Sequence, residues 1–361
     1  MDFSQVQRWM GGGVRGLARS IPGFADRAAA GRYGTRLQDS IVAVHEYGSD
    51  EILDNVRSAV AAELTTLPTY LYPYWSIRPA ADGGSPGAQV ARVELMAVIV
   101  EEMLHMGLSS NLLNALGGEP NLTERPYLPV FPGKLLRSTA RPDGWGPDVD
   151  LLPLGAESIA MLKRIELPET ATPHPGPTLG HFYHAHVERR LPPHDDSYRG
   201  GRQLAPWDNP GPGRLYSIAS RRDADRAVNE IIHQGEGLSL ADHDDGDHEL
   251  AHYWRFDLVQ KLLNARALSP PRDVYAVVPS PADYVDSYTD RQLESNAEFN
   301  RTYSRMLDSL EATLRSDSPD VYPIATGLMS RLQLQATRLR QLGPIPGTHL
   351  CAGPTFDYVG A

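Results

Sequence analysis

The chain has 361 residues, of which 41% are hydrophobic and 22% charged, as is usual for a soluble globular protein. A net charge of −11 argues against nucleic acid or an anionic membrane as the main partner. Cys351 is the only cysteine, so no intrachain disulfide can form, and neither a signal-peptide core nor a membrane-spanning apolar stretch is evident. We therefore expect a cytoplasmic protein.

The first half of the chain predicts two long helices. Residues 1–45 are rich in Gly, Arg and Ala with weak periodicity, which indicates an N-terminal arm or a loosely packed short helix. Helical periodicity begins at Ser49, and Pro68 and Pro73 are expected to kink or end this first helix. A second helix is predicted over residues 89–116, where a pair of glycines follows as a C-terminal cap.

The second half predicts further helices joined by Pro- and Gly-rich segments. Residues 119–148 are expected to be irregular, with room for one short hairpin. Strand signals are otherwise scarce, so the predicted fold class is all-α. The remaining helices are predicted over residues 154–169, 178–191, 222–237, 249–265, 290–315 and 322–341.

The most informative pattern is the spacing Glu-x-x-His. It occurs at Glu102/His105, Glu230/His233 and Glu249/His252, whereas composition alone predicts about 0.6 such pairs. Residues i and i+3 are neighbours on a helix surface, so each pair can present a carboxylate and an imidazole to one point. The first and third pairs lie on apolar helix faces, where ionisable groups without partners are costly. The second pair is expected to be an ordinary surface pair.

Two single carboxylates extend the pattern, because Glu63 falls on the apolar face of the first helix and Glu236 ends the helix over residues 222–237. Four helices that supply Glu, Glu-x-x-His, Glu and Glu-x-x-His provide the ligand set of di-iron or di-manganese carboxylate bundles. Several anionic oxygens offset the charge of two divalent cations, and imidazole supplies a terminal nitrogen. The predicted metal ligands are Glu63, Glu102, His105, Glu236, Glu249 and His252.

Two residues have alternative interpretations. Glu249 is in the first turn of its predicted helix, where a carboxylate also complements the helix dipole. His181, in the stretch GHFYHAH, is either a further ligand, a hydrogen-bond donor to a ligand, or a core residue.

Several stretches resemble the ferritin-like family that includes the ferritin-like portion of iminophenyl-pyruvate dimer synthases. The resemblance spans about residues 50–361 and rests on AAELTTLPTYLYPYWSI, EEMLHMGLSSNLLNALGGEP, LGHFYHAHVERRL, NEIIHQGEG, ELAHYWRF, FNRTYSRMLDSLE and AGPTFDY. It implies a helical, metal-containing oxidative enzyme that acts on a small molecule, with Glu63, Glu102, His105, Glu236 and His252 as ligands. Relatives commonly have Glu at the positions of His181 and His233, and a His in place of Glu at position 181 would make the site of this chain richer in nitrogen.

These observations predict a ferritin-like four-helix bundle with additional C-terminal helices. The expected domains are an arm over 1–45, a metal-binding bundle over 46–268 and a helical extension over 269–361 that packs on the bundle. The expected function is a non-haem oxidoreductase with dinuclear iron, or manganese or a mixed pair, that uses dioxygen or peroxide. Its substrate would be a small amine, amino acid or aromatic metabolite of specialised metabolism, and a homo-oligomer is compatible with the pattern.

In this hypothesis Glu102 and Glu249 bridge the metals. Tyr183 is the candidate catalytic residue if it lies within hydrogen-bond reach of them, and Tyr70, Tyr72, Trp75 and Tyr253 are expected to wall the pocket. Two alternatives remain at this level. One is a ferritin-like protein that holds a metal or ligand, or serves as an accessory subunit, without turnover. The other is a mononuclear site in which His181, His105 and His252 hold one metal with a carboxylate.

Overall fold

The computed structural model describes residues 49–169, 178–204, 207–208, 213–236, 250–315 and 322–360, so the predicted N-terminal arm lies outside the described residues. The chain from Ser49 to Ala361 forms one compact unit. Among the helices of the described ranges, none has the length and apolar character needed to cross a lipid bilayer. The longer helices are α3 (Ser49–Ser76), α4 (Pro86–Ala115), α5 (Ala156–Ile165), α7 (Arg221–Glu236), α8 (His252–Asn264), α10 (Asp290–Leu314) and α11 (Tyr322–Gln341).

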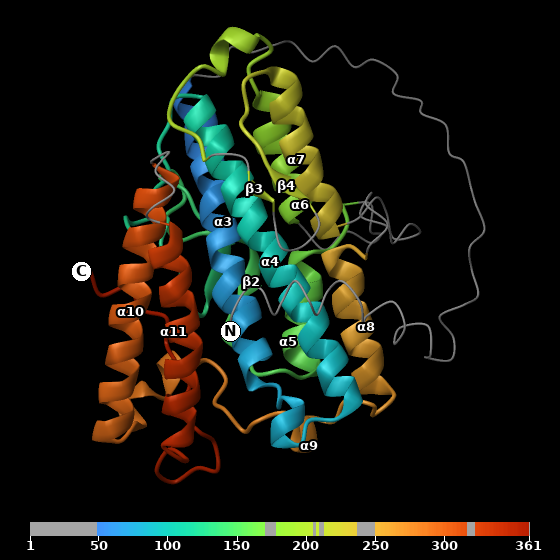
Figure 1. Ribbon diagram of the computed structural model, residues 1–361, viewed down its shortest axis with the longest axis vertical. Helices are drawn as coiled ribbons and strands as arrows, with labels where there is room; N and C mark the ends of the chain where they lie inside the picture. The colour runs from blue at the N-terminus through green and yellow to red at the C-terminus, as the bar shows by residue number, and fades with distance from the viewer. Residues whose placement is uncertain are drawn as a thin grey trace, which may run out of the picture. The chain divides into compact units, whose positions relative to one another are not determined.

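The helix pair α3–α4 forms the centre of this unit (Figure 1). The α4 helix is buried on every side from Ala97 to Ala115, apart from a partly exposed Met103, because α3, α7, α8 and α10 all contact it. A helix that is apolar all round is stable only when other elements cover it in this way. The start of α4 is well defined, since Ser85 caps it by accepting a hydrogen bond from the backbone N–H of Ala88, and Pro86 occupies the first turn.

Two shorter helices in series occupy each of the other two positions of the bundle. One series consists of α5 and α6 (Leu179–Phe182), and α6 continues into the π-helical turn η2 (Tyr183–Val187). The other consists of α7 and α8, with α5 packed against α8 and α6 against α7 (Figure 1). Among the described residues the bundle therefore has two continuous helices and two positions that are each filled by a pair of shorter ones, and both α7 and α8 contact α4.

Two sequence-based expectations about local structure need correction. Of the two effects expected of Pro68 and Pro73, a kink or an end, the end does not occur, since α3 runs through both to Ser76. Burial of Leu64, Tyr70 and Tyr74 along this helix outweighs the hydrogen bonds that the prolines remove. The second correction concerns α8, which begins at His252 rather than Glu249, because Ala251 in front of it has an extended backbone.

Two short antiparallel ribbons interrupt the helical fold. The first, β1 (Gly133–Leu136) with β2 (Trp145–Val149), is the short hairpin that the Pro- and Gly-rich segment allowed. Lys134 and Asp148 face each other in its register, and their charged atoms lie 2.6 Å apart. The second ribbon, β3 (Trp207–Asp208) with β4 (Arg214–Leu215), was not predicted from the sequence.

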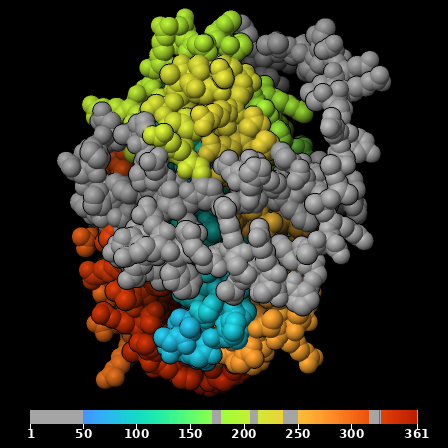
Figure 2. Space-filling model, turned by 45° about the vertical axis from the view of Figure 1, so that its right-hand side comes forward, coloured from blue at the N-terminus to red at the C-terminus, as the bar shows by residue number. Residues whose placement is uncertain are grey.

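The C-terminal helices α10 and α11 pair with each other and contact α4 and α3 respectively. A capping box begins α10, in which Thr289 and Gln292 exchange side-chain and backbone hydrogen bonds. Figure 2 shows another face, with α7 at one end and the start of α4 at the other. The short helical turns are η1 (Ala80–Asp82), η3 (Glu188–Arg190), η4 (Asp195–Ser197), α9 (Pro270–Asp273), η5 (Pro281–Asp283) and η6 (Val285–Ser287).

Candidate metal centre

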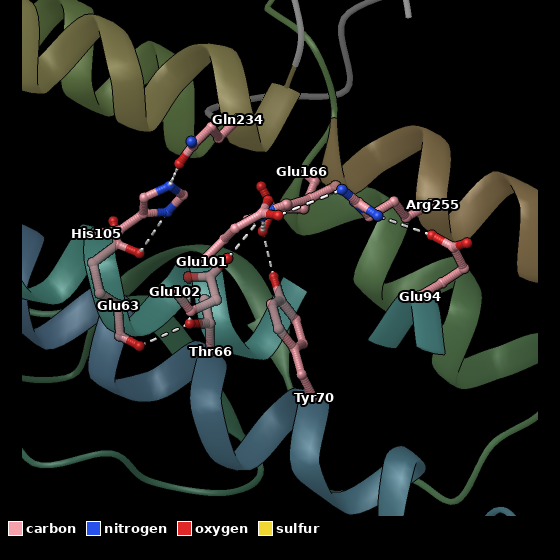
Figure 3. A network of polar contacts seen from close by, with 11 residues as sticks. Glu63, Thr66, Tyr70, Glu94, Glu101, Glu102, His105, Glu166, Gln234 and Arg255 are labelled. Atoms are coloured by element: carbon pink, nitrogen blue, oxygen red, sulfur yellow. Dashed lines mark hydrogen bonds and ion pairs between the residues drawn. The ribbon is translucent and has the colours of Figure 1, made fainter. Parts of the chain in front are cut away.

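A cluster of buried carboxylates and imidazoles lies where the two pairs of shorter helices meet α3 and α4 (Figure 3). Glu63 comes from α3, Glu102 and His105 from α4, and His252 is the first residue of α8. Each of the four is at most 2% exposed. Glu102, His105 and His252 each offer one ligand atom, and these three atoms lie within 4.8 Å of one another. The structure thus brings together four of the predicted ligands.

His252 is held between three carboxylates. Its Nε2 lies 2.9 Å from Oε2 of Glu101 in a hydrogen bond. Its Nδ1 lies 2.9 Å from Oε1 of Glu102 and 3.7 Å from Oε1 of Glu166, but makes a well-aligned hydrogen bond to neither. Burial disfavours the imidazolium form, yet these carboxylates together raise the pKa of His252 well above its usual value.

His105 has the same orientation on the other side of the cluster. Its Nε2 lies 2.8 Å from Oε1 of Gln234, and its Nδ1 lies 3.8 Å from Oε2 of Glu63. Burial lowers the pKa of His105, although the charge of Glu102 opposes this. The rings of His105 and His252 are stacked, with centroids 5.4 Å apart and planes inclined by 29°. In both imidazoles Nδ1 therefore points toward Glu63 or Glu102, and Nε2 forms a hydrogen bond with a side chain on the outer side of the cluster.

Two tyrosines donate hydrogen bonds to carboxylates of the cluster. The hydroxyl of Tyr183 donates to Oε1 of Glu63 and lies 3.1 Å from Oγ of Ser109. The hydroxyl of Tyr70 donates to Oε1 of Glu166. Burial and the neighbouring carboxylates raise the pKa of both phenols well above the ordinary value, so both remain protonated at neutral pH. The structure places Tyr183 beside a predicted ligand, in the position that a proton-holding group would need.

The buried carboxyl groups outnumber the buried cations in the described part of the chain. Five glutamates are buried there, whereas the only buried side chain with a permanent positive charge is Arg255. Burial and the charge of Glu102 raise the pKa of Glu63 well above its ordinary value. Burial also opposes ionisation of Glu102, but its contact with His252 holds the pKa of Glu102 below the usual range. Such an excess of carboxylates is costly unless cations compensate for it.

The cluster also satisfies a test for metal binding that is independent of charge. Oε2 of Glu63 and Nδ1 of His252 are buried and have no hydrogen-bond partner, although most buried polar atoms in proteins have one. Once deprotonated, a carboxylate oxygen and an imidazole nitrogen are both ligands that suit a divalent transition metal. Thr66 holds the second oxygen of Glu102, Oε2, through a hydrogen bond of 2.8 Å. The residues present therefore fit a bound metal.

Sequence reasoning missed Glu166, Glu101, Gln234 and Arg255. Glu166 caps the C-terminal end of α5 and is 1% exposed. Its signal was readable, because it follows Ile159 and Leu162 by seven and four residues and so continues their apolar face. Glu101 had no such signal, since it precedes Glu102 on a helix that is buried all round.

The remaining predicted ligands are not at the cluster in the described residues. His181 is 43% exposed, and its Nδ1 lies 3.2 Å from Oε1 of Glu169, so we withdraw it as a ligand. Its place at the start of α6 turns it away from the bundle core, in which Phe182 and Tyr183 are buried instead. Glu249 and the side chain of Glu236 lie outside the described residues.

The expected aromatic wall is divided between different surroundings. Tyr70 contacts the cluster, whereas the hydroxyl of Tyr72 donates to the backbone oxygen of Val278. Trp75 stacks on Phe356 at a centroid distance of 5.7 Å. A small cavity beside α11 is lined by Tyr72, Trp75, Ser76 and Arg340, among others, but by none of the clustered carboxylates or histidines.

Comparisons with known proteins agree with this architecture. A sequence model of the ferritin-like family matches residues 56–261, which include every described residue of the cluster. The fold is similar to the crystal structure of a ferritin-like protein from Caulobacter vibrioides, with a TM-score of 0.58 and 21% identity over 83% of this chain and 98% of that one. No curated protein matches the chain. The family and the buried histidine–glutamate site together support metal binding. The predicted ferritin-like bundle with additional C-terminal helices is confirmed, and the chain belongs to the ferritin-like family.

Proposed function

We propose that the protein is a metal-dependent oxidoreductase with a dinuclear iron, manganese or mixed site that uses dioxygen or peroxide. The observation that carries this proposal is the buried cluster in which Oε2 of Glu63 and Nδ1 of His252 have no hydrogen-bond partner. Two imidazoles and several carboxylates on packed helices are the donor set of dinuclear carboxylate centres. Family membership agrees with this proposal, since the ferritin-like fold also carries di-iron oxidoreductases.

The arrangement suggests how two metal ions would be held. His105 and Glu63 would hold one, His252 and Glu166 the other, and Glu102 would be shared because it lies near both histidines. A bound pair of iron or manganese ions supplies one-electron redox chemistry and open positions for an oxidant. The protein's own part is to exclude water by burial and to keep protons at the hydroxyl oxygens of Tyr183 and Tyr70, beside Glu63 and Glu166.

The substrate in this proposal is a small amine, amino acid or aromatic metabolite. This choice of substrate depends on the resemblance to the ferritin-like portion of iminophenyl-pyruvate dimer synthases. A cytoplasmic location and a homo-oligomeric state are further parts of the proposal that the sequence allows. Aromatic side chains do lie near the cluster, since Tyr70 packs edge-to-face on Phe256 with ring centroids 5.3 Å apart.

A mononuclear enzyme is the second candidate, and one specific observation favours it. The three ligand atoms within 4.8 Å of one another come from two histidines and one carboxylate, Glu102. This set is typical of mononuclear non-haem iron oxygenases. The number of metal ions per chain separates the two candidates.

The test is elemental analysis of the purified protein after anaerobic reconstitution with iron(II), followed by absorption spectra before and after oxygen is admitted. We expect about two metal ions per chain and new charge-transfer bands that depend on oxygen. Glu102→Ala should lose both metals and remain helical by circular dichroism. Glu294→Ala, which removes an exposed glutamate of α10, is the matched control and should bind metal like the wild type.

Each alternative result has a definite meaning. Full metal occupancy in Glu102→Ala would contradict the assignment of the metal site. One metal per chain would transfer the proposal to the mononuclear candidate. Two metals with no oxygen-dependent spectral change would contradict an oxidoreductase that uses dioxygen, and the same spectra recorded with hydrogen peroxide would then decide whether peroxide is the oxidant.

A further inference from the structure

The two histidines of the cluster are oriented alike but are held by different groups. Each directs Nδ1 inward and uses Nε2 for an outer hydrogen bond. For His252 the outer partner is a carboxylate, Glu101, at 2.9 Å. For His105 it is the neutral amide oxygen of Gln234, at 2.8 Å (Figure 3). Both partners accept a hydrogen bond through oxygen, so Nε2 of each ring carries a proton, and a metal that displaces any proton from Nδ1 would be bound through that nitrogen.

Glu101 belongs to a buried chain of charged side chains. Its Oε1 lies 3.4 Å from Nη2 of Arg255, whose Nη1 donates to Oε2 of Glu94 at 3.0 Å. All three side chains are buried between α4 and α8 (Figure 3). No comparable cation faces Gln234 in the contacts found among the described residues.

A carboxylate behind a ligating imidazole has a specific effect on the metal that the imidazole binds. The anion draws on the Nε2 proton, which makes the ring a stronger electron donor, and it fixes the orientation of the ring. A neutral amide fixes the orientation as well but adds little to the basicity of the ring. Removal of such outer partners typically changes metal affinity by about 10- to 100-fold.

We propose that the two metal positions are unequal, and that the position at His252, supported by Glu101 and Arg255, binds its ion more tightly and fills before the position at His105. Glu101 and Gln234 are thus positioning residues, which act on the metals only through the histidines. This inference rests on the proposed dinuclear site. The difference would allow the chain to place two different metals, or two oxidation states, in a defined order.

The experiment is calorimetric titration of the metal-free, full-length protein with cobalt(II), with visible absorption of the bound cobalt recorded at each addition. In the wild type we expect two sequential equivalents that differ at least about tenfold in affinity. Glu101→Gln keeps the hydrogen bond but removes the charge, and should weaken the first equivalent by about 10- to 100-fold while the second is unchanged. Gln234→Glu makes the reverse exchange and should strengthen the second equivalent.

Asp273→Asn is the control, because it also removes a completely buried carboxylate, but one that accepts hydrogen bonds from Ser85 and Ser269 and touches neither Arg255 nor His252. It should leave the gap between the two equivalents intact. An effect as large as that of Glu101→Gln would show that bulk charge matters rather than the contact with His252, and would overturn the inference. If Glu101→Gln does not fold, as judged by circular dichroism, Gln234→Glu decides alone.

The wild-type titration distinguishes a failure of the unequal affinities from a failure of the dinuclear site. Two equivalents of equal affinity would overturn the inequality and leave the dinuclear site in place. A single equivalent, or none, would contradict the dinuclear site itself, and the inequality with it.

Discussion

At the scale of single residues, the site consists of carboxylates in places where carboxylates destabilise the fold. Glu63 is completely buried, and one of its oxygens has no partner. Glu102 lies close to it and is ionised, so the two repel each other unless a proton or a metal intervenes. Tyr183 donates a hydrogen bond to one oxygen of Glu63, and Thr66 donates one to a single oxygen of Glu102. We therefore expect these carboxylates to lower the stability of the metal-free fold while they serve metal binding.

Glu63→Gln tests this conflict directly. The substitution removes a buried acid without changing its shape, so in the absence of metal we expect the free energy of unfolding to rise by about 0.5–2 kcal/mol at pH 7. Adding metal should then increase the stability of the variant much less than that of the wild type. Urea denaturation with a chelator and with metal measures both effects. A variant that is less stable than the wild type without metal would contradict the view that Glu63 is strained.

At the scale of secondary-structure elements, the ends of the shorter bundle helices supply groups that continuous helices would direct elsewhere. Glu166 follows the last residue of α5, Gln234 lies in the last turn of α7, and His252 begins α8. The π-helical turn η2 adds Tyr183, whose hydroxyl contacts Glu63, and such turns are frequent at functional sites. The helix ends converge because α5 packs on α8 and α7 on both α8 and α4.

Gly235 allows this convergence, and its replacement should be harmful to the site. A Cβ atom at this position would lie 2.9 Å from Oε2 of Glu166, which Tyr70 holds from the other oxygen. Gly235→Ala should therefore displace the carboxylate and lower metal affinity by roughly tenfold, while the helix content stays the same. Metal titration and circular dichroism measure the two properties.

Gly327→Ala on α11 is the control for the same substitution in a helix with open space around it. It should leave metal affinity unchanged and stabilise the fold by about 0.5–1 kcal/mol, because alanine loses less backbone entropy than glycine. Wild-type affinity in Gly235→Ala would mean that Glu166 is free to move and is not needed by the metal.

At the scale of the whole compact unit, Asp273 connects the segment after α8 to the start of α4. It is completely buried and accepts hydrogen bonds from the backbone N–H groups of Ser85 and Ser269, at 2.9 and 2.8 Å. The backbone N–H of Arg78 also donates to its carbonyl oxygen. Burial opposes ionisation, but the guanidinium of Arg272 and these backbone groups hold the pKa of Asp273 well below its usual value. The ionised carboxylate thus stabilises this corner of the fold.

Asp273→Asn should lower the free energy of unfolding by about 1–3 kcal/mol at pH 7. Because the pKa is lower in the folded than in the unfolded chain, the carboxylate contributes fully above the unfolded pKa of about 4. Its contribution is lost as the pH falls through the folded pKa, so the difference between variant and wild type should shrink below about pH 4. Urea denaturation at several pH values measures it, and Asp283→Asn, at an exposed aspartate, should show no such difference at any pH.

Local periodicity in the sequence was sufficient to predict the helices and part of the site. Glu102 and His105 lie three residues apart on one helix, so their proximity follows from helix geometry alone. Glu63 was found because a carboxylate on an apolar face is conspicuous in the sequence. The ferritin-like class followed from combining these patterns with His252.

Only the tertiary structure could decide which groups complete the cluster. Glu166 and Gln234 reach it because they lie at the end of α5 and in the last described turn of α7, and packing between distant segments brings these two helices to the cluster. The same packing starts α8 at His252 and leaves His181 at the surface with Glu169. The sequence by itself determined the residues whose neighbours lie within one helical turn. The tertiary structure decided those whose neighbours come from other helices, because burial, charge compensation and hydrogen-bond partners depend on which elements meet.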